Sequence, residues 1–124
     1  MSCAAGLAVL ETMRDERLVE NVVARGAELV SGLGAIAAED DRIGDIRGPG
    51  LMVGVEFTDR ATGTPDGALP DRLMADCADN GLLVLSCGQV HETIRWIPPI
   101  DVTAGEIAEA VEIFGETLAS IPRD

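Results

Sequence analysis

The chain has 124 residues, 47% of them hydrophobic and only 2% aromatic, so we expect one domain with an aliphatic core. All nine basic residues are arginine and the net charge is −13, which disfavours nucleic acid and anionic membranes as partners. Because the chain contains no lysine, no side chain can form a Schiff base with a carbonyl compound.

The sequence favours a cytoplasmic location. No apolar run approaches the roughly 20 residues of a membrane span, and the first residues lack the basic start of a signal peptide. Cys3, Cys77 and Cys87 are too few and too widely spaced for a disulfide framework. The acidic composition fits a salty cytoplasm, and a coding bias toward arginine is the alternative.

The chain is expected to begin with two helices, over about residues 3–13 and 18–38, separated by a charged break at residues 14–16. The second has apolar residues and a glycine spaced three and four apart, which predicts one buried stripe. The stripe consists of Val19, Val22, Gly26, Leu29, Leu33 and Ile36. Asp40 and Asp41 follow, and we expect both to face solvent.

Strands and a third helix are expected next. A short strand at residues 43–47 and a tight turn at residues 48–50 precede a strict alternation whose core face is Leu51, Val53, Val55 and Phe57. A helix is expected over residues 69–80 and a central strand, buried on both faces, over residues 82–85. A strand at residues 93–97 precedes the last helix, which Thr103 and Glu106 open as a capping box.

This order predicts an α+β fold, a small antiparallel or mixed sheet with helices packed on one face. We expect residues 1–124 to form a single domain, in which residues 1–38 are leading helices and residues 43–124 are the core of sheet and helix.

Few residues suggest chemistry. Cys87 and His91 are four apart, but a nucleophile and base would need an orienting third group, so we expect a turn cysteine and a solvent-facing histidine. The sequence has no recognisable zinc spacing, and it suggests no catalytic, cofactor-binding or metal-binding residue.

Arg95 is the best candidate for a binding residue. It lies between Ile94 and Trp96 in a segment that otherwise resembles core, where a charged guanidinium needs an anionic partner. From the pattern alone a structural salt bridge, to Glu56 or Glu92, is slightly favoured over a substrate carboxylate. Glu56 is alternatively expected to face Arg47 or to lie in water.

Three segments carry a family resemblance: SCAAGLAVLETM, IGDIRGPGLMVGVEF and GLLVLSCGQVHETIRWIPPIDVT. Together they resemble the C-terminal domain of class III pyridoxal-phosphate aminotransferases, most closely the 4-aminobutyrate type. The resemblance implies the small domain of a fold-type I enzyme that packs on a large domain within a homodimer. It also implies that Arg95 contacts a substrate carboxylate.

In that family the lysine that binds pyridoxal phosphate, and the other cofactor contacts, lie upstream of the matching segments. The chain is therefore expected to resemble the last third or less of such an enzyme, to bind no pyridoxal phosphate covalently and to be inactive alone. Its expected partners are the large domain or a homodimer partner, and a small carboxylate substrate. The alternative is a stand-alone module that binds small carboxylates, or a structural module that complements a separate large domain.

Overall fold

The computed structural model describes residues 2–59 and 61–123, and its elements follow the predicted order. The helices are α1 Ser2–Asp15, α2 Leu18–Glu39, α3 Ala68–Asp79 and α4 Ala104–Ser120. The strands are β1 Ile43–Arg47, β2 Val53–Phe57, β3 Leu85–Cys87 and β4 Thr93–Trp96. The sequence therefore predicted the type of every element and placed most boundaries within one or two residues.

The four strands form one sheet in the order β1-β2-β4-β3, and every neighbouring pair is antiparallel. The turn between β1 and β2 depends on two glycines with positive φ, 137° at Gly48 and 54° at Gly50, where L side chains are strained. The amide of Met52 donates to the carbonyl of Pro49 at 3.0 Å and closes this turn. The predicted α+β fold is confirmed, and its sheet is antiparallel.

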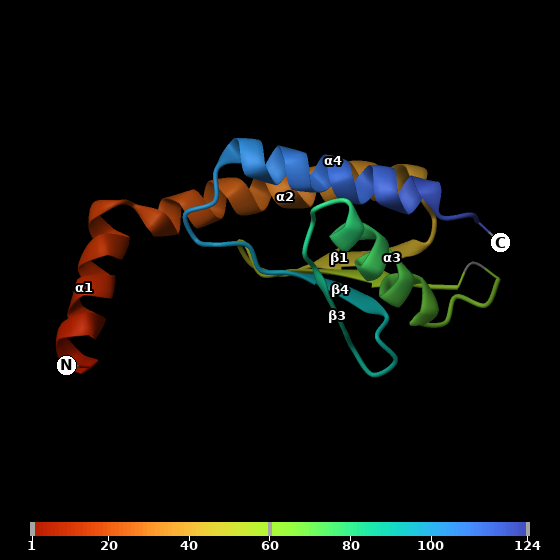
Figure 1. The fold of residues 1–124 in the computed structure, drawn as a ribbon, viewed down its shortest axis with the longest axis horizontal. Coiled ribbons are helices and arrows are strands. Elements are labelled where there is room, and N and C mark those ends of the chain that lie inside the picture. Colours follow the sequence, from red (N-terminus) through yellow and green to blue (C-terminus); the bar gives the residue numbers. More distant parts are fainter. Residues whose placement is uncertain (1, 60, 124) are drawn as a thin grey trace.

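Helices α2, α3 and α4 cover one face of the sheet, with α2 and α4 side by side (Figure 1). The alternation in β2 is confirmed, because Val53, Val55 and Phe57 are buried. Trp96 of β4 meets Phe114 of α4 edge to face, with ring centroids 5.3 Å apart. The residues of α2 and α4 in the core are Leu29, Leu33, Ile107, Phe114 and Leu118.

The capping box at the start of α4 is confirmed. The hydroxyl of Thr103 accepts from the amide of Glu106, and the Glu106 carboxylate accepts from the Thr103 amide at 2.8 Å. The hydrogen bonds that the Glu106 carboxylate accepts from the amide and the hydroxyl of Thr103 lower the pKa of Glu106. The side-chain amide of Asn21 in α2 donates to the carbonyl of Val102 at 3.0 Å, which fixes the approach to the cap.

Several predictions about burial are wrong. The run at residues 82–85 is not a central strand, because β3 begins only at Leu85 and lies at the sheet edge, with Leu83 86% exposed. A continuous apolar run does not distinguish two buried faces from one buried face plus an uncovered one. The buried stripe predicted for α2 is also wrong at one position, because Val19 is exposed and its neighbour Leu18 is buried.

Asp40 is also not in solvent. It is buried beside Arg42, whose Nη2 lies 2.6 Å from Asp40 Oδ2 and whose Nε lies 2.9 Å from Oδ1. Arg42 also donates to the carbonyls of Leu118 and Ile121, at 2.9 and 3.0 Å, where α4 ends. The pair thus joins the α2–β1 connection to the C-terminus of α4.

Helix α1 projects from the rest of the molecule (Figure 1) and has no buried residue. Leu7, Val9 and Leu10 are each more than half exposed. Within the described part of the chain, α1 contributes nothing to the core, and its apolar side chains lie uncovered.

Candidate functional site

The face of the sheet opposite the helices carries Arg95. Partners across antiparallel strands share a face. Two adjacent rows of partners cross this face, one of Arg47, Gly54, Arg95 and Leu85 and the other of Asp45, Glu56, Thr93 and Cys87. Arg95 therefore shares one surface with Arg47 and both strand carboxylates.

Arg95 is exposed, so the expectation that it lies in the core is wrong. Its neighbours in β4, Ile94 and Trp96, are buried because β4 has helices on one side only. Among residues 2–59 and 61–123, Arg95 forms no ion pair and no side-chain hydrogen bond. The proposed salt bridges to Glu56 and Glu92 are therefore absent, and the guanidinium faces outward with its donors available.

The prediction that Glu56 faces Arg47 is confirmed. Nη2 of Arg47 lies 2.7 Å from Glu56 Oε2, and its Nη1 lies 2.6 Å from Asp45 Oδ2. The hydrogen bonds to Asp45 and then to Glu56 raise the pKa of Arg47 above its ordinary value. Arg47 thus binds two carboxylates at once, one on its own strand and one on the neighbouring strand.

Apolar side chains surround Arg95 on this side of the molecule. Leu85, its partner on β3, is more than half exposed, as is Ile97, which follows two residues later. Met52, the residue before β2, is exposed as well. A guanidinium flanked by exposed apolar side chains suits a binding face, because covering these side chains excludes water and strengthens the charged interactions of the guanidinium.

Cys87 and His91 do not form a nucleophile and base. Nδ1 of His91 lies 3.2 Å from Oδ1 of Asp71, and the hydroxyl of Ser86 donates to the same oxygen at 2.9 Å. These two hydrogen bonds lower the pKa of Asp71. His91 is exposed, as predicted, and Cys87 ends β3 just before the turn. The sequence pattern missed Asp71, because helix α3 brings it to Ser86 of β3 and to His91 of the β3–β4 loop, which are 15 and 20 residues away.

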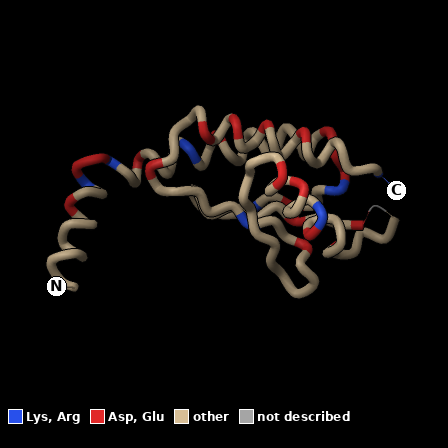
Figure 2. Tube along the Cα trace, in the orientation of Figure 1, with Lys and Arg blue, Asp and Glu red and all other residues tan. Residues whose placement is uncertain are grey.

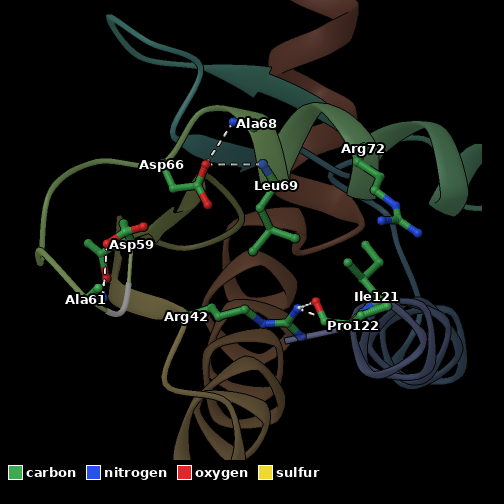
Figure 3. A pocket seen from close by; sticks show the side chains of 10 residues that line it. Arg42, Asp59, Ala61, Asp66, Ala68, Leu69, Arg72, Ile121 and Pro122 are labelled. Carbon is green, nitrogen blue, oxygen red and sulfur yellow. Dashed lines mark hydrogen bonds between the residues drawn. The ribbon is translucent and has the colours of Figure 1, made fainter. Parts of the chain in front are cut away.

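A pocket of about 420 Å³ lies between the 58–66 loop, α3 and the end of α4 (Figure 3). Its polar groups serve the local structure. Arg42 is bound to Asp40, and Asp59 accepts from the amides of Ala61 and Thr62. Asp66 accepts from two amides at the start of α3, at 2.9 and 3.3 Å. Among the described residues that line it, the pocket therefore offers no cluster of unengaged polar groups.

Other kinds of site find no support in the described residues. No group of three or more histidine, cysteine, aspartate or glutamate residues among them is placed to hold a metal ion. None of the described helices is long and apolar enough to cross a membrane. Carboxylates are spread along α4 (Figure 2), on the side of the molecule away from the outward sheet face.

Comparison with known proteins identifies the relatives of this chain. A family model described as Aminotransferase class-III matches residues 1–118. The 5-aminovalerate aminotransferase of Pseudomonas putida is 34% identical over 121 residues, which are 98% of this chain and 28% of that protein. The 4-aminobutyrate aminotransferase of Escherichia coli is 34% identical over 117 residues, 94% of this chain and 28% of that protein.

A solved structure with the same fold gives a further comparison. An Arthrobacter phospholyase, solved in complex with phosphoethanolamine, superimposes with a TM-score of 0.91 at 28% identity, over 96% of this chain and 28% of that chain. The chain thus spans about 28% of the length of the proteins it matches.

Proposed function

The chain belongs to the class III aminotransferase family, and from this premise we propose that it is the C-terminal part of an enzyme that moves an amino group from an amine or amino acid to a 2-oxo acid. In this proposal Arg95 binds the terminal carboxylate of the substrate. The substrate class that we propose for this enzyme is a 4-aminobutyrate-like ω-amino acid, with an amine at one end and a carboxylate at the other.

The observation that carries this proposal is the state of Arg95, an exposed guanidinium with no ion pair among the described residues. A guanidinium presents a planar set of donors that matches a carboxylate in a two-point contact. The relatives are named for 5-aminovalerate and 4-aminobutyrate, which both carry a carboxylate far from the amine. The ligand of the phospholyase structure, phosphoethanolamine, carries an anionic phosphate in the equivalent chemical position.

The class III family depends on pyridoxal phosphate, which supplies the electron sink for amino transfer. These 124 residues do not fit that cofactor on their own, because they include no lysine to hold its aldehyde. In this proposal the chain contributes no catalytic, cofactor-binding or metal-binding residue. It supplies a substrate contact and the scaffold that positions it.

The proposed partner is the large domain of such an enzyme, within a homodimer. Two uncovered apolar surfaces support this partner, one on α1 with Leu7 and Leu10 and one around Arg95 with Leu85 and Ile97. Burying apolar area of this kind is the main driving force for association. The alternative is a stand-alone module, 1–124, that binds small carboxylates or has a structural role only.

The test is a titration of the isotope-labelled chain with glutarate, 4-aminobutyrate and 2-oxoglutarate, followed by NMR. We expect shifts centred on Arg95 and its partners Gly54 and Leu85, and Arg95→Ala should weaken binding roughly ten- to a hundredfold, as loss of charged hydrogen bonds does. The control is Arg14→Ala, which removes an exposed arginine of α1. Equal binding by wild type and Arg95→Ala contradicts the proposal.

Adding a separately produced, lysine-bearing large domain distinguishes an enzyme part from a module. Amino transfer in the mixture, absent from either component, supports the enzyme. Carboxylate binding without any transfer in the mixture supports the stand-alone module.

A further inference from the structure

We infer that Arg47 is a positioning residue for the substrate site, because it binds both strand carboxylates and so keeps Glu56 from neutralising Arg95. The consequence of this role of Arg47 for substrate binding rests on the proposed function of Arg95. The competition between the two arginines is a property of the sheet itself and is testable without any substrate.

The register places Glu56 within reach of both arginines. Glu56 pairs with Thr93, and Arg95 lies two residues further along β4 on the same face. Glu56 and Arg95 are therefore diagonal cross-strand neighbours, whose backbones are roughly 7–8 Å apart. Long side chains span that separation by passing over the small Thr93 methyl, which lies against Gly54.

The strands of the sheet contain few charged residues, so the choice of arginine by each carboxylate decides whether Arg95 stays unpaired. The sequences of its strands, IGDIR, VGVEF, LSC and TIRW, contain two carboxylates, Asp45 and Glu56, and two arginines, Arg47 and Arg95. Both carboxylates lie against Arg47, at 2.6 and 2.7 Å. Both strand carboxylates are therefore engaged by one arginine, and Arg95 is left with neither.

Without Arg47, Glu56 would face Arg95 as its nearest strand cation. Groups held on one scaffold have an effective concentration of roughly millimolar or higher, so Glu56 would compete with a dissolved carboxylate. If Glu56 occupied Arg95 in nine molecules of ten, the apparent dissociation constant of the ligand would rise about tenfold, because only the free fraction binds. Arg47 thus determines the fraction of molecules in which the Arg95 guanidinium is free to bind a ligand.

The experiment compares the full 124-residue chain with the variants Arg47→Met and Arg47→Met/Glu56→Gln. The first readout is the Nε–Hε resonance of Arg95, assigned through its loss in Arg95→Ala. We expect this resonance to shift and its exchange with water to slow in Arg47→Met, and to return to the wild-type position in the double variant. Backbone spectra and thermal melts establish that each variant is folded.

The matched control is Arg72→Met. Arg72 is 59% exposed and pairs with Asp76 on α3, whereas Arg47 is 55% exposed. Its removal should leave the Arg95 resonance unchanged. An unchanged resonance in Arg47→Met overturns the inference, and so does a shift that Glu56→Gln does not reverse.

Glutarate binding is the second readout. We expect affinity about tenfold weaker in Arg47→Met and near wild type in the double variant. If the resonance behaves as expected but glutarate does not bind the wild-type chain, the proposed function fails and the inference about Arg47 stands. If glutarate binds through Arg95 with equal affinity in Arg47→Met, the inference fails and the proposed function stands.

Discussion

The buried pair of Asp40 and Arg42 provides the sharpest test of the fold. Replacing Asp40 with asparagine keeps the shape and one acceptor but leaves the buried guanidinium without a counter-charge. Breaking a buried pair in this way costs about 3–5 kcal/mol, and we expect the lower end because the carbonyls of Leu118 and Ile121 still accept from Arg42. For a chain of 124 residues, 3 kcal/mol lowers the melting temperature by roughly 12 °C.

Urea denaturation measures the free energy of unfolding, with Asp79→Asn as a control on an exposed carboxylate of α3. The control should stay within about 0.5 kcal/mol of wild type. In the double variant Asp40→Asn/Arg42→Met, the cost should be smaller than the sum of the single costs by at least about 1 kcal/mol. A loss below about 1 kcal/mol for Asp40→Asn would refute the argument from the buried charge.

The same pair predicts a pH dependence. Burial alone would raise the pKa of Asp40, but hydrogen bonds from Arg42 and the charges of Arg42 and Arg123 outweigh it, so the pKa lies below its ordinary value of 3.8. Because the folded pKa is the lower one, the stabilisation is fully present above the unfolded pKa and is lost as the pH falls through the folded pKa. The stability difference between wild type and Asp40→Asn should therefore shrink in acid, and a constant difference down to pH 2 contradicts this.

Two further predictions concern packing and association. Gly26→Ala should destabilise the fold by more than about 1 kcal/mol, because a β-carbon there would overlap the backbone carbonyl of Gly50. Gly34→Ala on the same helix has open space around it and should stabilise the fold by about 0.5–1 kcal/mol. Thermal melts that rank these two variants the other way contradict this prediction. The chain alone should self-associate through its uncovered apolar surfaces, and Leu7→Gln/Leu10→Gln should reduce this, because both leucines are exposed on α1. Sedimentation showing a stable monomer of the unaltered chain would exclude this surface as a driver of association.

The sequence pattern predicted the helices and strands well, and it predicted less about the site. The spacing in α4 and the alternation in β2 each depend on local repeats, which one buried face imposes directly. Arg95 was identified as the residue of interest, but its burial was wrongly expected, because alternation assigns a residue to a face without saying whether anything covers that face. The pairing of Glu56 with Arg47 was one of three alternatives from the sequence, and the antiparallel register of β1 and β2 selected it.

The element order, the capping box at Thr103 and the family resemblance were all determined by the sequence itself, since each depends on neighbouring residues or on motifs read along the chain. Tertiary structure decided which charges meet. It buried Arg42 against the end of α4, left Leu83 exposed just before the edge strand and brought Glu56 of β2 to Arg47 of β1. The physical reason is that burial and ion pairing depend on strand order and register, which join residues far apart in the chain and leave no trace in local periodicity.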